Sequence, residues 1–357
     1  MVAHTEPSRH PELGAQVMRL LTGAWIARAV QVATLVGVPD ALADGPLPLA
    51  ELASRTGTQP DPLYRVLRAL ATVGVVTEED GDINSISAER DKTRTPRFRL
   101  AELGTNLRSD IPGSLGPFAI MMGSDWVWRS WGAMVHTLRT GETAFDSVFG
   151  SPVFDYYATH ADAARIGAAG LTSRSATEND AILAAYDLSA ARRIIDVGGG
   201  EGSLLRAALR VHPDMTGVLL EMPHVVEFAC RAIDGAPEAG RTEFMAGDFF
   251  TEVPSGGDVY LLKKVLHDWT DEPAAAILRS IRAALAEEAR LLVIENVVLP
   301  GDEPCFAKLL DLLMLVYAGG RERTEAEFRQ LLATAGLTLT RVVPTAAAVS
   351  VLEAVRT

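Results

Sequence analysis

The glycine-rich run at residues 196–202 constrains the fold of this 357-residue chain more than any other feature. It reads Asp-Val-Gly-Gly-Gly-Glu-Gly, begins inside the apolar run 194–197 and passes directly into the helical segment Ser203–Val211. Glycines let a backbone turn tightly and approach a ligand closely at the carboxyl end of a strand, where open α/β sheets bind their ligands. The run therefore predicts a nucleotide-type site at a strand–helix junction.

The spacing of this run distinguishes between two classes of cofactor that the loop could bind. The dinucleotide fingerprint expects glycine or alanine at position 203, where this chain has Ser203. The spacing D-x-G-x-G-x-G fits a loop for S-adenosylmethionine (SAM) better. Because glycine-rich turns also serve as plain strand–helix junctions, the acidic residues downstream carry additional weight.

Two acidic residues support the cofactor prediction. Glu221 closes the second apolar run, near the ~20-residue offset at which nucleotide folds place a ribose-binding carboxylate. Asp248 ends the next predicted strand and can accept a hydrogen bond from an adenine amino group while Phe249 packs on the ring. The plainer alternatives are a surface carboxylate for Glu221 and a helix N-cap for Asp248.

The C-terminal half has the rhythm of an α/β fold. Apolar runs at residues 194–197, 217–220, 259–262 and 291–294 alternate with helical segments. This alternation predicts a doubly wound, mainly parallel sheet. Because the chain is long for a single domain, we expect a second domain before it.

The N-terminal part contains a helix-turn-helix pattern. A short helix at Leu49–Arg55 is followed by a break, and a second helix places four apolar residues at core-facing spacing between positions 63 and 70. DNA binding through Arg65 and Arg68 is one interpretation, and a winged-helix fold used for packing is the other. A formal charge of −13 favours packing, because phosphate binding depends on basic patches.

Residues 20–38 form the most apolar stretch, but Arg28, Gln31 and two glycines argue against a membrane-spanning helix. Polar residues recur there at every third position, so we expect a helix that is buried, often in a subunit interface. Cys230 and Cys305 have neither metal-ligand nor paired spacing, and no signal-peptide pattern precedes them. These features predict a reducing cytoplasm and no metal site.

Three further segments are interpreted from their composition. Residues 1–12 are polar and predict a frayed tail. Residues 78–97 are charged and predict a solvated loop, a wing tip or a lid, followed by a short strand from Phe98. Residues 110–190 are rich in aromatic side chains, most of which we expect in the core, with a few lining an apolar ligand pocket.

His267 lies just beyond the end of the run at 259–262 and is the predicted general base. A hydroxyl attacks a sulfonium methyl group only as it loses its proton, and imidazole ordinarily titrates near neutral pH. Such a base needs an acceptor that orients it, and Glu295 and Glu322 are the candidates. A structural histidine is the alternative for His267, and a solvated loop is the alternative for Glu322.

At these residues the chain resembles the caffeate-type family of small-molecule O-methyltransferases, whose bacterial members act on polyketides and other secondary metabolites. The matching segments lie along nearly the whole chain: Leu67-Arg-Ala-Leu-Ala71, Ile195-Asp-Val-Gly-Gly-Gly, Glu221-Met-Pro-His, Gly247-Asp-Phe, Leu262-Lys, Leu266-His-Asp-Trp and Gly319-Gly-Arg-Glu-Arg-Thr. Glu221 departs from the pattern, since aspartate is commoner there, and the loop before Pro96 is longer than the typical wing.

The resemblance implies an architecture. Residues 1–108 would form a mainly α-helical winged-helix dimerisation domain, residues 109–190 a helical connector lining the substrate pocket, and residues 191–357 a Rossmann-like class I methyltransferase domain with a mostly parallel seven-stranded sheet. It also implies a homodimer in which the N-terminal helices of one subunit help to close the substrate pocket of the other.

The resemblance also implies roles for individual residues. Gly198 and Gly200 would lie against SAM, Glu221 would bind its ribose, Asp248 and Phe249 its adenine, and Lys263 would add a contact. His267 would be the base, flanked by Glu295 and Glu322.

The predicted activity is SAM-dependent methylation of a hydroxyl on a small aromatic or polyketide-like molecule, without a nucleic-acid or membrane partner. One alternative is a SAM-binding relative with other chemistry, such as hydroxylation, decarboxylation, a pericyclic reaction or N-methyl transfer. The presence of His267 with both carboxylates weighs against it. A more remote alternative is a SAM-sensing DNA-binding regulator, for which only Arg65 and Arg68 offer a basic face.

Overall fold

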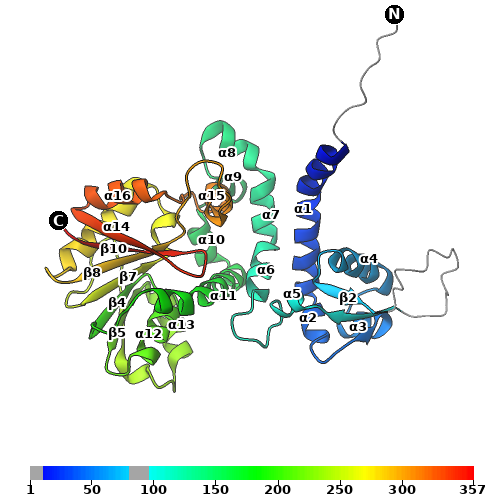
Figure 1. Ribbon diagram of the computed structural model, residues 1–357, viewed down its shortest axis with the longest axis horizontal. Helices are drawn as coiled ribbons and strands as arrows, with labels where there is room; N and C mark the ends of the chain where they lie inside the picture. Colours follow the sequence, from blue (N-terminus) through cyan, green and yellow to red (C-terminus); the bar gives the residue numbers. More distant parts are fainter. Residues whose placement is uncertain (1–10, 80–95) are drawn as a thin grey trace, which may run out of the picture. The chain divides into compact units, whose positions relative to one another are not determined.

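The computed structural model describes residues 11–79 and 96–357, which form two compact units, Met1–Ser124 and Asp125–Thr357 (Figure 1). Most of the predicted tail and of the predicted loop at 78–97 lies outside the described residues. Pro11 and Glu12 already belong to the first helix, so the tail prediction was wrong at its end. The predicted connector at 109–190 contributes helices to both units, and the boundaries between the three domains remain predictions.

The first unit is a winged helix. Helices α3 and α4 form the predicted helix-turn-helix, and three short antiparallel strands pair in the order β1-β3-β2. Its elements are α1 (Pro11–Leu35), α2 (Val38–Ala41), β1 (Leu47–Pro48), α3 (Leu49–Arg55), α4 (Pro60–Ala71), β2 (Val76–Glu78), β3 (Arg97–Leu100), α5 (Glu102–Thr105) and α6 (Gly116–Met122).

The sequence of helix α4 explains where this helix begins and which of its side chains are buried. It begins at Pro60, because proline lacks only a donor that the first helical turn does not use. Leu63, Leu67 and Leu70 are buried, as the spacing predicts, and pack with Phe98 of β3. Arg68 lies over the ring of Tyr64 at 5.0 Å.

Helix α1 is not covered by its own chain along the whole stretch of residues 20–38 that we expect to be buried, often in a subunit interface. The helix ends at Leu35, and Gly37 turns the chain into α2 with a φ of 80°. Leu20 is 81% exposed and Trp25 is 71% exposed, so this chain does not bury that face of the helix. Within the described residues, no helix is both long enough and apolar enough to cross a bilayer.

The second unit is built on one seven-stranded sheet. Its helices before the sheet are α7 (Asp125–Gly132), α8 (Met134–Thr140), α9 (Ala144–Phe149), α10 (Val153–Thr159) and α11 (Ala161–Ala185). The remaining elements are β4 (Arg193–Val197), α12 (Ser203–Val211), β5 (Thr216–Glu221), α13 (Pro223–Ile233), η1 (Ala239–Arg241), β6 (Thr242–Ala246), β7 (Val259–Lys263), η2 (Leu266–Asp268), α14 (Asp271–Ala284), β8 (Arg290–Glu295), α15 (Phe306–Tyr317), α16 (Glu325–Thr334), β9 (Leu337–Pro344) and β10 (Ser350–Arg356).

Consecutive residues of the central strands bury side chains on both faces of this sheet. Ile194 packs with α11 and α12 on one face, and Ile195 packs with α14 and α16 on the other. Leu261 and Leu262 of β7 divide in the same way. Strands covered on both faces are near-continuously apolar, which explains the four runs in the sequence.

The strand order is β6-β5-β4-β7-β8-β10-β9. Strands β4 to β8 pair in parallel, and β10 pairs antiparallel with β8 and β9. The order reverses between β4 and β7, and open α/β sheets bind ligands at such a switch point, outside the carboxyl ends of the strands. This is the Rossmann-like fold that the sequence analysis predicts, and it places the glycine run and His267 at one edge.

The aromatic side chains between residues 110 and 190 are less buried than expected. Phe145 is fully buried, whereas Phe149 and Tyr156 are half-buried and Phe154 is 45% exposed. The rings of Phe145 and Tyr317 lie 5.4 Å apart in an edge arrangement. These side chains contact one another across several short helices, so their rings are only partly covered.

Candidate active site

The loop after β4 lets a ligand approach the backbone. Gly198, Gly200 and Gly202 have φ values of 67°, 60° and 72°, in the left-handed region that favours glycine. No heavy atom lies within 4 Å of the place a Cβ would take on Gly200, so open space borders the loop. The same place on Gly198 lies 3.3 Å from the ring of Phe249, so the structure brings these two predicted residues together.

Asp196 lies under this loop with its carboxylate buried. A Cβ on Gly199 would overlap that carboxylate, so the loop wraps closely around it. Neither carboxylate oxygen meets a hydrogen-bond partner among the described residues. Burial raises the pKa of Asp196 to about 7, although the nearby Lys263 ammonium opposes this shift. An unpaired buried carboxylate is unfavourable by itself.

Glu221 and Asp248 follow neighbouring strands at the same edge. The carboxylate of Glu221 accepts hydrogen bonds from the backbone N–H of Gly200 at 3.2 Å and of Met222 at 2.6 Å. Oδ1 of Asp248 accepts from the N–H of Phe250 at 2.9 Å. Glu221 is thus joined directly to the glycine loop, whereas Asp248 stabilises its own turn after β6.

Lys263 is buried and bonded to helix α11. Its ammonium donates to the carbonyl and hydroxyl oxygens of Ser175, at 2.7 and 2.8 Å, and to Oδ1 of Asn179 at 2.8 Å. It also lies 3.4 Å from the carboxylate of Glu178. All three donors of the ammonium are therefore used on α11, and a direct contact of Lys263 with a cofactor remains a prediction.

His267 lies in η2, immediately beyond β7, and is 6% exposed. Its Nδ1 lies 2.8 Å from Oε1 of Glu322 and 3.7 Å from Oε2 of Glu295. Glu295 also accepts from the backbone N–H of His267 at 3.3 Å. When Glu322 is ionised, Nδ1 carries the proton and donates it, which leaves Nε2 as the basic nitrogen. Nε2 lies 3.5 Å from Oδ1 of Asp268.

The segment after α15 holds Glu322 against η2. A Cβ on Gly320 would overlap the backbone of His267, so only glycine permits this approach. The N–H of Arg321 donates to the His267 carbonyl at 2.8 Å. Arg323, which is 1% exposed, donates to the carbonyls of Leu266 and Trp269 at 2.8 Å each. The ends of η2 are thereby fixed, and with them the position of the imidazole.

Burial shifts the acids of this group toward neutrality. It raises the pKa of Glu322 to about 7, and Lys264 and Arg174 oppose the shift. It raises the pKa of Asp268 to about 6, and it also raises that of Glu295. One oxygen each of Glu295 and Glu322 has no hydrogen-bond partner in the described part of the chain. Strongly shifted acids next to a histidine at a sheet edge are typical of a catalytic site.

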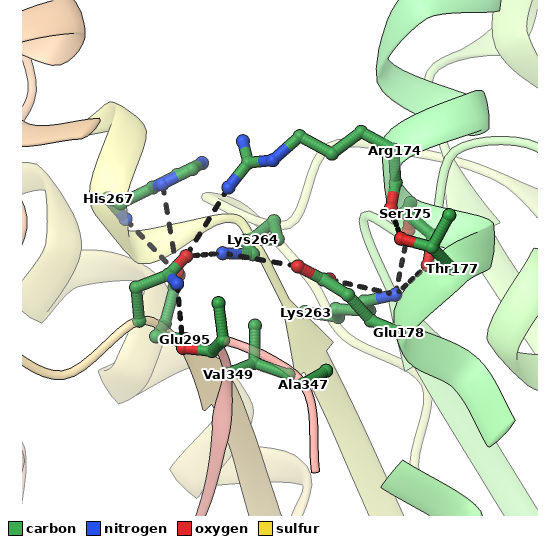
Figure 2. A network of polar contacts seen from close by, with 12 residues as sticks. Arg174, Ser175, Thr177, Glu178, Lys263, Lys264, His267, Glu295, Ala347 and Val349 are labelled. Atoms are coloured by element: carbon green, nitrogen blue, oxygen red, sulfur yellow. Dashed lines mark hydrogen bonds and ion pairs between the residues drawn. The ribbon is translucent and has the colours of Figure 1, made fainter. Parts of the chain in front are cut away.

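Lys264 and Arg174 adjoin these acids, and Lys263 lies beside Glu178. Figure 2 shows Lys263 and Lys264 both reaching toward Glu178, and Arg174 extending from α11 toward the side where His267 and Glu295 lie. The ligand atoms of His267, Glu295 and Glu322 lie within 4.8 Å of one another, close enough to surround a metal ion. The neighbouring cations oppose a further positive ion, so we interpret the group as a hydrogen-bonded triad.

Several residues of this site were missed by the sequence reasoning. Asp196 was recognised only as part of the glycine run, although an acid at the end of the first strand was a usable signal. Nothing in the sequence marked Glu178 or Asn179 of α11, or Asn296 after β8. The predicted residues otherwise form two adjoining groups: His267, Glu295 and Glu322 make the triad, and the loop glycines lie with Glu221 and Phe249.

The fold and the site define a Rossmann-like class I methyltransferase. The model of the O-methyltransferase domain family matches residues 128–338, and that of the O-methyltransferase dimerisation domain matches residues 18–109. The chain therefore belongs to the O-methyltransferase family, and it is an enzyme that uses SAM.

Similar proteins agree with this assignment. The phenazine O-methyltransferase of Lysobacter antibioticus is 41% identical, with 96% of each chain covered. The mitomycin biosynthesis 6-O-methyltransferase of Streptomyces lavendulae is 40% identical, over 91% of this chain and 89% of the relative. The crystal structure of CalO1, a methyltransferase in calicheamicin biosynthesis with S-adenosylhomocysteine bound, superposes with a TM-score of 0.84 at 36% identity, covering 99% of this chain and 100% of that one.

Two further relatives are named for reactions other than O-methylation. An 8-amino-8-demethylriboflavin N,N-dimethyltransferase of Streptomyces davaonensis is 33% identical, over 98% of this chain and 97% of the relative. The aclacinomycin 10-hydroxylase of Streptomyces purpurascens is 34% identical, over 87% and 81%. Membership of the family therefore leaves the reaction to be argued from the site.

Proposed function

We propose that this enzyme transfers the methyl group of SAM to a hydroxyl of a small aromatic secondary metabolite, with His267 as the general base. The observation that carries this proposal is the buried hydrogen bond of 2.8 Å between Nδ1 of His267 and Glu322, at the sheet edge where the glycine loop lies. This bond leaves Nε2 free to accept a proton.

The residues around the glycine loop fit SAM. The Glu221 carboxylate, bonded to Gly200, supplies acceptors for the two ribose hydroxyls. Asp196 supplies a buried and unpaired carboxylate for a positively charged molecule. Phe249, next to Gly198, offers a ring face for the adenine, and Asp248 offers an acceptor for its amino group.

The chemistry assigned to the triad is proton removal from the acceptor hydroxyl. SAM supplies an electrophilic methyl group on a sulfonium, toward which an alkoxide or phenolate is a far better nucleophile than a neutral hydroxyl. Nε2 of His267 takes the proton, and Glu322 and Glu295 stabilise the resulting imidazolium from the other side of the ring. Arg323 keeps the ring in place by bonding the carbonyls on both sides of it.

An aromatic acceptor is supported by the rings on α9, α10 and α15. The ring of Phe145 lies 4.7 Å from that of Phe149, 5.5 Å from that of Tyr156 and 5.4 Å from that of Tyr317. Tyr317 and Tyr157 share a hydrogen bond between their hydroxyls. A group of aromatic rings with a few polar atoms suits a flat, oxygenated molecule, such as the phenazine and mitomycin skeletons named for two relatives.

The complete triad favours O-methylation over the chemistry of the differently named relatives. Nitrogen acceptors already carry a lone pair and need a base less. The DNA-binding alternative is weakened because the helix-turn-helix lies inside the match to the dimerisation domain.

We also propose a homodimer formed through α1. The helix exposes Leu20, Leu21 and Trp25, and large exposed apolar side chains on one helix are typical of a protein interface. The match to the dimerisation domain begins at residue 18, inside this helix.

The test combines binding and methyl transfer. Calorimetric titration with SAM, and separately with NAD, is followed by a labelled-methyl assay on a panel of phenols and hydroxyquinones. We expect SAM binding, no NAD binding, and label transfer to an oxygen. His267→Ala should bind SAM normally but lose ~10²-fold or more of its activity, because general-base catalysis contributes about that much.

His212→Ala, in the turn between α12 and β5, is the matched control and should behave as the wild type. SAM binding without label transfer across the panel would contradict methylation. Full activity in His267→Ala would contradict the assignment of the base while leaving methylation intact.

A further inference from the structure

Lys264 has an unusual backbone. Its φ is 57°, the one positive value found for a non-glycine residue in the described part of the chain. It follows β7 directly, and its N–H donates to the carbonyl of Ile294 in β8 at 3.1 Å. A left-handed conformation is unfavourable for a long side chain, and such strain is found mainly at functional sites.

The strained turn changes where the Lys264 side chain points. Successive side chains of a strand point to opposite faces, yet Lys263 and Lys264 both reach Glu178, at 3.4 and 3.9 Å (Figure 2). The ammonium of Lys264 also donates to Oδ1 of Asn296, which is fully buried and whose amide donates to the Ala348 carbonyl at 2.8 Å. Lys264 is therefore held beside Asn296, the residue that directly follows Glu295 of the triad.

Lys264 is not required to neutralise Glu178. Lys263 is closer to that carboxylate and is fixed on α11 by three hydrogen bonds. Glu295 and Glu322 instead pair with His267, and each of them, like Glu178, has one buried oxygen without a hydrogen-bond partner among the described residues. The ammonium of Lys264 attracts both carboxylates electrostatically.

The charged groups around Glu322 come from every element that surrounds it. Arg174 from α11 and Lys264 after β7 favour its ionised form, as does Arg323 beside it. Asp311 from α15 opposes ionisation, although the Glu322 N–H donates to it at 2.8 Å. His267 and Asp268 of η2 and Glu295 of β8 complete the surroundings. With burial opposing it, ionisation of Glu322 near neutral pH depends on the cations.

The protonation of Glu322 decides which nitrogen of His267 is basic. An ionised carboxylate accepts from Nδ1–H and leaves the lone pair on Nε2. A protonated carboxyl would itself donate to Nδ1, and the imidazole would then carry its proton on Nε2, where it could not accept another.

We propose that Lys264 is a positioning residue, whose ammonium keeps Glu322 ionised and thereby holds His267 in the tautomer with a basic Nε2. This inference rests on the proposed role of His267 as the base. Lys264 touches no reacting atom; it acts through Glu322.

The test is the pH dependence of kcat/KM, measured with the best methyl acceptor of the phenol panel. Lys264→Met keeps the length of the side chain and removes the charge, and Lys263 still pairs with Glu178 in the variant. Loss of a nearby opposite charge moves a carboxyl pKa upward by about one unit or more. We expect a loss of about tenfold at pH 6 that shrinks to less than twofold at pH 9, with an unchanged SAM affinity. Lys264→Arg should restore the wild-type profile.

Lys308→Met is the matched control, since this lysine on α15 bonds only the carbonyls of Gly301 and Glu303. A ligand-free readout is NMR of ¹⁵N-histidine-labelled protein, with the His267 signals identified by their absence in His267→Gln. The wild type should show protonated Nδ1 at pH 7, and Lys264→Met should show that form only at higher pH.

Three outcomes would overturn the inference: an equal loss at every pH, a rise in KM alone, or an unchanged His267 titration. If His267→Ala stays active, the base assignment itself fails. If His267→Ala is inactive and Lys264→Met shows no pH-dependent loss, only the role of Lys264 fails.

Discussion

Asp196 shows how one buried carboxylate can oppose stability. Burial raises its pKa to about 7, from an ordinary value of 3.8. Because the folded protein holds this proton more tightly than the unfolded chain does, the contribution of Asp196 to stability is fully present below pH 3.8. It is lost as the pH rises to about 7. Without SAM, the ionised carboxylate is therefore a destabilising feature at neutral pH.

We predict that Asp196→Asn stabilises the SAM-free protein above pH 7 and has little effect near pH 4. The upper bound is a few kcal/mol, at roughly 1.4 kcal/mol per pKa unit. The same variant should bind SAM at least about tenfold more weakly, since it loses a charged partner. Denaturant unfolding at several pH values and calorimetry measure the two effects.

Asp214→Asn, in the exposed turn before β5, is the control and should change neither quantity. A stability difference that is the same at pH 4 and pH 8 would show that ionisation of Asp196 is not its cause.

At the scale of elements, helices α1 and α11 illustrate two ways of placing a helix. Helix α11 is held by buried polar bonds from Lys263 to Ser175 and Asn179. Helix α1 instead presents a row of large apolar side chains that its own chain leaves exposed. The first arrangement supports the triad, and the second is suited to a partner.

We predict that Trp25→Glu shifts the protein from dimer to monomer, because a buried charge without a partner disfavours an apolar interface. Analytical ultracentrifugation over a range of concentrations measures the change. Val211→Glu, on the exposed end of α12, carries the same kind of substitution outside α1 and should leave the association state unchanged. A Trp25→Glu variant that remains fully dimeric would place the interface elsewhere.

At the scale of the whole molecule, the candidate active site and the dimerisation-domain match lie in different units. The unit Asp125–Thr357 contains the glycine loop and the triad, and the unit Met1–Ser124 contains the whole match to the dimerisation domain. A ligand that binds only the folded state stabilises it by about 2.7 kcal/mol at a hundredfold excess over its Kd.

We predict that SAM slows amide hydrogen exchange in the unit Asp125–Thr357, most strongly after β4, β5 and β6. Exchange within α3 and α4 should change little, because the predicted SAM-binding residues all follow residue 190. Mass-spectrometric exchange with and without SAM measures this, with NAD as the negative control. Protection confined to the first unit would contradict the assigned cofactor site.

Much of the fold and part of the site could be read from local pattern. The glycine run, the four apolar runs and the helix at Leu49–Arg55 all appear where the spacing predicts them. Strand β7 ends one residue beyond the predicted run, at Lys263. The burial of residues 20–38 could not be judged, because an apolar helix pattern does not say which surface covers it.

By itself the sequence determined the class of fold and the type of cofactor, because strand periodicity and glycine spacing act over a few residues. Only the tertiary structure decided which acid bonds His267. Glu322 is 55 residues away in the sequence, and Gly320 lets its segment pack closely against the backbone of His267. The structure also decided that Lys263 and Lys264 face one carboxylate, which depends on a single backbone angle. Charge pairing and burial depend on groups that meet across the fold, and that is why local spacing could not supply them.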